Sequence, residues 1–273
     1  MKRKTKLTRT LLSLELLEDR CCLSSLPLGT PLAQPDAATQ ARIGEAYGQL
    51  PLSFVANQGQ TDAQVNFTAR GSGYTLYLTP GEAVLDLQKP GKPGVVAPGD
   101  ALHMQLVGAN PAPAVVGLDQ QAATTNYLIG NDPGQWHTQL ANYGKVQYQG
   151  VYPGIDLVYY GNQRQLEYDF IVAPGANPNA IALSFQGAES MTLDSHGDLV
   201  LHTATGDVLE HAPVIYQEIA DVRHEVTGNY LLDGSGQVRF QVGVYETTRP
   251  LVIDPLYALV YSTYLGGSGS DYG

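Results

Sequence analysis

The chain has 273 residues, enough for one large β domain or two small ones, and only 15% of its residues are charged. Its 30 glycines, 17 prolines and 17 tyrosines favour short strands joined by tight turns and argue against a helical bundle or a disordered chain. The net charge is −11, and because an acidic body repels a phosphate backbone, we expect no nucleic-acid binding.

The first 25 residues differ from the rest in charge. Of the chain's 15 basic and 26 acidic residues, six basic and three acidic ones lie here, so residues 26–273 keep 9 basic and 23 acidic residues and a net charge of −14. A basic start followed by a Leu-rich run predicts an export leader over residues 1–25. Glu15, Glu18 and Asp19 interrupt the run, which is too charged and too short to span a membrane. The alternative is a frayed amphipathic helix with no targeting role.

Residues 26–46 are rich in Pro, Ala and Thr and predict a linker, with a short helix near its end as an option. Both cysteines, Cys21 and Cys22, precede the globular part, whose core is therefore expected to form without disulfides. Residues 47–257 are predicted to be an all-β domain. A division into two subdomains near residues 145–180 is an alternative.

Alternating apolar and polar residues between clusters of Gly, Pro, Asn and Asp predict roughly 15 short strands and no convincing helix in this domain. The fold class expected is therefore all-β, as a multi-stranded antiparallel sandwich-like sheet. In chain order the predicted strands span residues 54–56, 64–69, 74–78, 83–87, 102–107, 125–129, 136–140, 155–160, 166–172, 181–185, 191–193, 199–203, 208–210, 213–219, 225–232, 237–245 and 251–255.

The clearest hairpin joins residues 155–160 to residues 166–172 through a polar turn. Its second strand should turn apolar side chains to the core and Glu167 and Asp169 to the opposite face, with their carboxylates about 6–7 Å apart. Asp156 is expected to face them from the neighbouring strand, and Tyr160 lies among several tyrosines that can stack on sugars. Asp156, Tyr160, Glu167 and Asp169 are therefore the candidate ligand-binding residues.

Three interpretations of this acidic face stay open. A solvated face opposite a buried one is the simplest, a calcium site is a second, and acid/base work on glycosides is a third. No HExxH or G-x-S-x-G motif occurs, and the six histidines have no close zinc-ligand spacing. We therefore predict no catalytic residues, no metal site among the histidines and no cofactor.

Several blocks in order carry a family resemblance. They include the YQGVYPGIDLVYYG block of residues 148–161, the LEYDF block of residues 166–170, the PLVIDP block of residues 250–255 and the YSTYLGG block of residues 261–267. Together they resemble the N-terminal domain of unknown function that precedes SBBP (β-propeller) repeats in bacterial surface proteins. The LELLEDR stretch of residues 14–20 likewise resembles a leader of exported planctomycete-type proteins.

The resemblance implies export, an extracellular or cell-surface location and a β-propeller partner. Residues 258–273 are similar to the first strand of a propeller repeat, and the missing repeats imply a truncated array. The expected function is a non-enzymatic structural or interaction module. The alternatives are a carbohydrate-binding module for surface polysaccharide or a glycoside-hydrolase-associated domain, and another surface protein is a further possible partner.

Overall fold

A computed structural model describes residue 42 and residues 50–87, 100–163, 165–204 and 206–258 of the chain. The predicted leader, nearly all of the predicted linker and the predicted repeat strand beyond residue 258 lie outside these residues. Every strand described below belongs to one compact unit, which begins after residue 42.

This unit is all-β, which confirms the predicted fold class. The described residues hold 17 strands and two single-turn 3-10 helices. They are β1 (Phe54–Ala56), β2 (Phe67–Gly71), β3 (Tyr74–Leu78), β4 (Glu82–Leu87), β5 (Asp100–Leu106), β6 (Ala114–Tyr127), η2 (Pro133–Gln135), β7 (His137–Tyr152), β8 (Ile155–Gly161), β9 (Gln165–Val172), η3 (Pro178–Ala180), β10 (Leu183–Gln186), β11 (Ser190–Leu193), β12 (Leu199–Thr203), β13 (Gly206–Ile219), β14 (Val222–Val226), β15 (Gly228–Leu232), β16 (Val238–Val242) and β17 (Leu251–Ala258).

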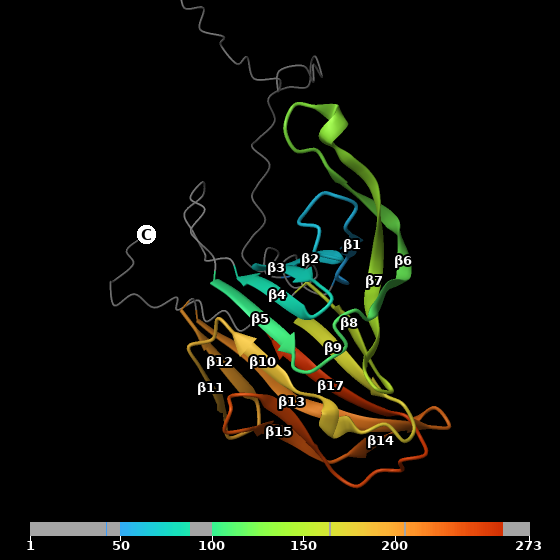
Figure 1. Ribbon diagram of the computed structural model, residues 1–273, viewed down its shortest axis with the longest axis vertical. Helices are drawn as coiled ribbons and strands as arrows, with labels where there is room; N and C mark the ends of the chain where they lie inside the picture. The colour runs from blue at the N-terminus through green and yellow to red at the C-terminus, as the bar shows by residue number, and fades with distance from the viewer. Residues whose placement is uncertain (1–41, 43–49, 88–99, 164, 205, 259–273) are drawn as a thin grey trace, which may run out of the picture. The chain divides into compact units, whose positions relative to one another are not determined.

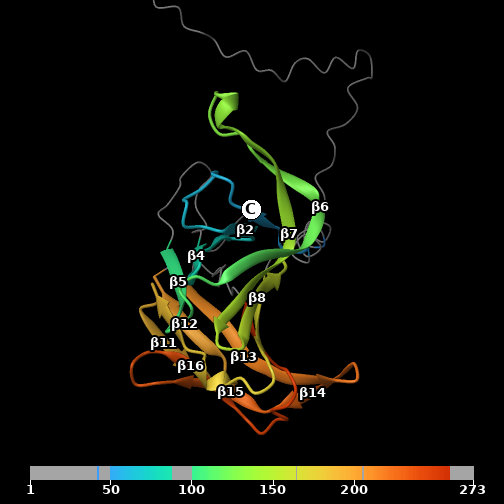
Figure 2. The same cartoon turned by 45° about the vertical axis from the view of Figure 1, so that its right-hand side comes forward.

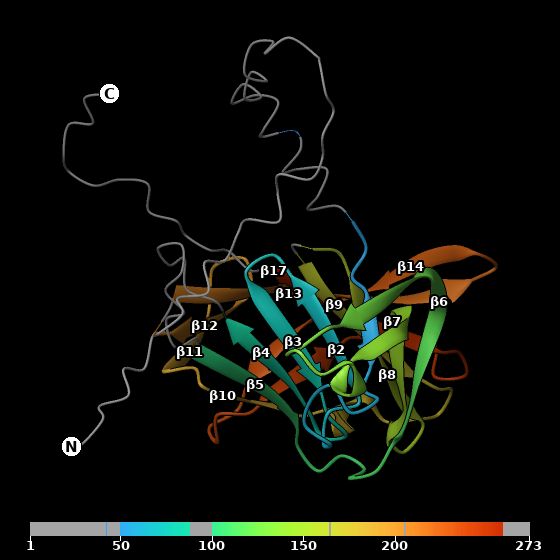
Figure 3. The ribbon, with the colours of Figure 1, turned by 90° about the horizontal axis from the view of Figure 1, so that it is seen from above.

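All of the strand pairs are antiparallel, and the sheet nearly closes on itself (Figures 1 and 3). From β1, one series of paired strands runs through β2, β3, β4, β5, β10 and β16 to β15. The other runs through β7, β8, β9, β17 and β13 to β14. The alternative division near residues 145–180 falls in β7 to β9, which pair with one another and, through β1 and β17, with strands from both ends of the domain.

The inward face of this sheet is the core. On β9 the burial alternates residue by residue, and Leu166, Tyr168, Phe170 and Val172 are at most 1% exposed. Burying each such side chain stabilises the fold by roughly 1.5–3 kcal/mol. Aromatic rings continue the core across the sheet, since the Phe170 ring meets the Phe240 ring at a centroid distance of 5.8 Å. The predicted apolar face of the central hairpin therefore packs inward.

The longest hairpin, β6–β7, extends beyond the closed part of the sheet (Figures 1 and 2). Sequence patterns predict only the short strands of residues 125–129 and 136–140 there. Most of β6 is exposed on both faces, so its residues show no apolar alternation that would predict a strand. We call β6, β7 and the turn between them the arm.

A second difference concerns the predicted strand of residues 225–232. The structure breaks it at Thr227 into β14, which pairs with β13, and β15, which pairs with β16. The Thr227 carbonyl accepts a hydrogen bond from the Gly243 N–H at 2.7 Å, and a side chain at Gly228 would collide with Ile215. The break thus carries the chain from one part of the sheet to the other.

Candidate functional site

The four predicted site residues lie on the outward face of β8 and β9. Cross-strand pairing sets Tyr160 opposite Glu167, Val158 opposite Asp169 and Asp156 opposite Ile171. Because side chains alternate along a strand, these positions all share the face that points away from the core. All four candidates are partly buried rather than fully solvated.

Asp156 belongs to a β-bulge on this face. Its carboxylate accepts a hydrogen bond from the Gly150 N–H at 2.7 Å and another from the Gln147 side-chain amide at 3.0 Å. Gly150 has a φ of 63°, and the β7–β8 register shifts beside it. Both oxygens of Asp156 therefore point to β7, and the side chain holds the bulge.

The other three candidates join a residue that sequence reasoning did not select. The Tyr160 hydroxyl donates to Asp169 Oδ1 at 3.0 Å. On the far side of β9, the pairing of Ile253 with Phe170 and of Leu256 with Glu167 places Asp254 of β17 beside Asp169. The alternation of Val252, Asp254 and Leu256 signals an outward Asp254, but nothing in the sequence pairs β17 with β9. We call Glu167, Asp169 and Asp254 the carboxyl cluster.

Burial and mutual repulsion raise the pKa values of the carboxyl cluster above those of free carboxyl groups. The pKa of Asp169 is raised from 3.8 to about 7, chiefly by burial and then by the neighbouring Asp254, while the hydrogen bond from the Tyr160 hydroxyl opposes the rise. Burial also raises the pKa of Glu167, again with a contribution from Asp254. The pKa of Asp254 is raised by burial and lowered by Arg223 and by a hydrogen bond with Asp169. Near neutral pH Asp169 therefore remains partly protonated.

Two cations lie at the edges of this face, each against a tyrosine ring. Lys145 Nζ stands 5.5 Å from the centroid of the Tyr160 ring, and the Arg223 guanidinium stands 4.3 Å from that of Tyr216.

Within the described residues, no group of three or more His, Cys, Asp or Glu side chains is arranged to hold a metal ion. What the face can do chemically is share and exchange a proton among carboxyl groups.

Replacing Asp169 by asparagine is expected to stabilise the domain at high pH only. A carboxyl whose pKa is raised on folding contributes full stability below its unfolded pKa of 3.8, and loses it as the pH rises through about 7. Asparagine keeps an oxygen for the Tyr160 hydroxyl but cannot ionise. After a discount for partial exposure, we expect Asp169→Asn to add about 1–2 kcal/mol to the free energy of unfolding at pH 8 and almost nothing at pH 4.

Urea unfolding followed by far-UV circular dichroism at both pH values measures this difference. Glu189→Gln is the matched control, because Glu189 is an exposed carboxyl outside the cluster and should show the same stability as the wild type at both pH values. A stability gain for Asp169→Asn that is equal at pH 4 and pH 8, or a loss at pH 8, would contradict the assigned ionisation.

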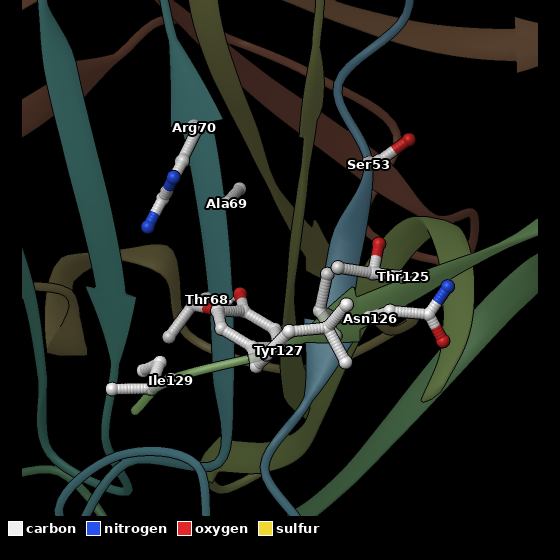
Figure 4. Close-up of a pocket in the computed structure, with 10 residues that line it drawn as sticks. Ser53, Thr68, Ala69, Arg70, Thr125, Asn126, Tyr127 and Ile129 are labelled. Atoms are coloured by element: carbon white, nitrogen blue, oxygen red, sulfur yellow. Dashed lines mark hydrogen bonds between the residues drawn. The ribbon is translucent and has the colours of Figure 1, made fainter. Parts of the chain in front are cut away.

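A separate hollow lies where the arm crosses the outward face of β1 and β2 (Figure 4). It has a volume of about 350 Å³, and a smaller hollow of about 140 Å³ continues it toward β3. The two share the lining residues Thr68, Arg70, Tyr127 and Ile129. We call the two hollows together the arm groove. Sequence reasoning missed it, because its walls come from β2 and the end of β6 and meet only in the folded sheet.

No helix in the described part of the chain is long and apolar enough to cross a membrane. No curated protein and no solved structure matches the chain. A family model described as "Domain of unknown function (DUF7948)" matches residues 54–256, which run from the start of β1 into β17. Since this match covers well over half of the sequence, the chain belongs to the DUF7948 family.

Proposed function

We propose that this domain is a non-enzymatic interaction module of an exported bacterial cell-surface protein, and that the arm is its docking element. The exposed apolar tip of the arm carries the proposal. Leu128, Ile129 and Trp136 are 59%, 67% and 37% exposed. Large apolar and aromatic side chains gathered on a projecting element are typical of protein–protein contact sites.

Hydrogen bonds within the tip restrict its backbone and the Trp136 side chain. The Trp136 indole N–H donates to the Gly130 carbonyl at 3.2 Å, and Asp132 Oδ1 accepts from the Gly134 N–H at 2.9 Å at the start of η2. A side chain that is already ordered loses less entropy on binding. The tip is therefore suited to present Trp136 as an anchor.

The base of the arm is anchored to the segment just before β1, while no residue of β6 is buried. Ser53 Oγ donates to Gln121 Oε1 at 2.6 Å, and the Gln121 side-chain amide donates to the Leu52 carbonyl at 3.2 Å. A strand without buried residues, such as β6, buries little apolar surface and adds little to folding stability. A contact role accounts for the length of the ribbon better than a role in the core does.

The resemblance of the sequence blocks supports a β-propeller of SBBP repeats as the docking partner and the cell surface as the location. The family match itself gives a domain of unknown function and adds no partner. Carbohydrate binding is a second candidate function, favoured by a different observation, the polar arm groove.

We expect Leu128→Ser/Ile129→Ser to weaken docking by at least tenfold. The two changes remove apolar contact area at the tip without touching the core, since both side chains are exposed. The measurement is isothermal titration calorimetry of the full chain against a purified β-propeller made of the implied repeats and taken from the same genome. We expect a micromolar dissociation constant for the wild type.

Val222→Ser/Leu231→Ser is the matched control, because these two apolar side chains are exposed to a similar degree, 55% and 49%, but lie on β14 and β15. It should bind the propeller as the wild type does. If the wild type shows no binding, or if both double variants lose affinity equally, docking through the arm is wrong.

A further inference from the structure

The arm groove combines one cation with a set of hydroxyl groups. Arg70 is exposed on β2, and its guanidinium has no ion pair and no hydrogen bond to any described residue. Figure 4 shows this side chain on the side of β2 where Thr68, Tyr127 and Ile129 gather. Among the described lining residues of both hollows none is acidic. An unpaired guanidinium facing a hollow is a ready partner for a carboxylate.

The threonine and tyrosine hydroxyl groups around Arg70 are partly or fully buried but make few hydrogen bonds. Thr68 and Thr75 are only 7% and 8% exposed although they lie on the outward face, because the arm passes over them. Within the described residues the Tyr127 hydroxyl contacts Thr68 Oγ1 at 3.5 Å, the outer limit of a hydrogen bond. The side chains of Thr75 and Tyr77 have no hydrogen-bond partner in the described part of the chain. The groove thus offers donors and acceptors to a polyhydroxylated ligand.

The strand register shows why Arg70 stays unpaired. Arg70 lies opposite Thr75 of β3, and Thr75 lies opposite Asp86 of β4. The next carboxylate on this face is therefore two strands away, about 10 Å at strand spacings of 4.7–4.9 Å. The chain's net charge of −11 repels anions, but at physiological ionic strength salt largely screens charges that are more than about 8 Å away. Close to the groove the local cation decides which ligand fits.

We propose that the arm groove binds a uronic acid unit of an acidic polysaccharide. Arg70 receives the carboxylate in a bidentate pair, the hydroxyls of Thr68, Thr75 and Tyr127 exchange hydrogen bonds with the sugar hydroxyls, and the rings of Tyr77 and Tyr127 offer apolar surface to the sugar ring. A hollow of about 350 Å³ lies at the lower end of the range for small-ligand sites, which suits one or two sugar units. A single cation among hydroxyls favours this ligand over an acidic peptide, whose carboxylates come without sugar hydroxyls.

This site deepens the second candidate function, carbohydrate binding, and does not depend on propeller docking. Leu128 and Ile129 of the tip line one end of the groove, but Arg70, Thr68 and Thr75, which carry the proposal, lie on β2 and β3. It also differs from the carboxyl cluster, where the tyrosine expected to stack on sugar, Tyr160, donates its hydroxyl to Asp169. The two surfaces can therefore be tested separately with single variants.

The test is isothermal titration calorimetry of the full chain with trimers of galacturonic, glucuronic and mannuronic acid and with their methyl esters. We expect at least one acid trimer to bind with a dissociation constant near or below 1 mM, its methyl ester to bind at least tenfold more weakly, and affinity to fall as NaCl rises from 50 to 500 mM. Arg70→Gln should lose at least tenfold in affinity, and Thr68→Val a smaller factor.

Arg223→Gln is the matched control, because Arg223 is an exposed cation on β14 far along the chain from the groove and stacked on Tyr216. It should bind the trimer as the wild type does. Hexaglutamate separates the two anion classes, and equal affinity for hexaglutamate and the acid trimers would overturn the saccharide assignment. Binding by none of the trimers, or undiminished binding by Arg70→Gln, would overturn the site. Unchanged docking of Arg70→Gln onto the propeller would leave the two proposals independent.

Discussion

Replacing Glu210 by leucine is expected to destabilise the domain by about 2–4 kcal/mol. Glu210 lies on β13 and is fully buried, and its Oε1 accepts hydrogen bonds from the Tyr168 hydroxyl at 2.5 Å and the Tyr230 hydroxyl at 2.7 Å. Leucine accepts neither, and a buried hydroxyl that loses its acceptor costs about 1–3 kcal/mol. The Tyr230 hydroxyl can still donate to the His211 carbonyl at 3.1 Å, so the larger loss is expected at Tyr168. The expense of burying a carboxyl group offsets part of the loss.

Glu210→Gln is the conservative counterpart. Its amide oxygen can accept from both tyrosine hydroxyls, so we expect its free energy of unfolding to stay within about 1 kcal/mol of the wild type. The measurement is urea unfolding followed by far-UV circular dichroism, because the single tryptophan, Trp136, lies in the arm and does not report on the core. For a domain of this length each kcal/mol should move the melting temperature by about 2–4 °C.

A double variant separates the lost hydrogen bond from a simple packing change. Adding Tyr168→Phe to Glu210→Leu removes the donor together with its acceptor, so the pair should be less destabilised than the sum of the two single changes, by about 1 kcal/mol or more. Strict additivity, or a Glu210→Leu variant as stable as the wild type, would mean that these hydrogen bonds do not hold the core together.

Local alternation predicted much of this fold, because it is a property of each strand alone. The apolar face of Leu166, Tyr168, Phe170 and Val172 is the buried one, and the strands of residues 155–160 and 166–172 form the expected hairpin. The arm escaped prediction for the opposite reason. No residue of β6 is buried, and β6 pairs with β7 through backbone hydrogen bonds, which do not depend on residue type.

The carboxyl cluster was only half predictable. Glu167 and Asp169 share a face by their spacing alone, but Asp254 reaches them through the pairing of β17 with β9, which joins segments about 80 residues apart. Asp156 shows the converse problem. Its strand position suggested a partner for the two acids, whereas the bulge at Gly150 turns its carboxylate to β7. Pairing between distant strands and bulges are tertiary features that periodicity does not encode.

Gly161→Ala is expected to destabilise the domain by about 3 kcal/mol or more. Gly161 ends β8 with a φ of 138°, a conformation that side-chain-bearing residues rarely adopt. An added Cβ would also collide with the carbonyl oxygen of Gln165. That oxygen accepts from the Asn162 N–H at 2.9 Å, and the Gly161 carbonyl accepts from the Leu52 N–H at 3.1 Å. Relieving the collision therefore disturbs the turn and the contact with the segment before β1 together.

Gly175→Ala is the control that isolates the backbone conformation from the collision. Gly175 also has a positive φ, 77°, but an added Cβ there meets nothing within 4 Å, so only the conformational cost of about 1 kcal/mol remains. Urea unfolding of both variants measures the difference. Because the β8–β9 turn sets Tyr160 opposite Glu167, Gly161→Ala should also flatten the pH dependence of stability that the carboxyl cluster produces, while Gly175→Ala should preserve it. Equal losses in the two variants would show that the collision at Gly161 is relieved without cost, and that the turn does not fix the register of the face it supports.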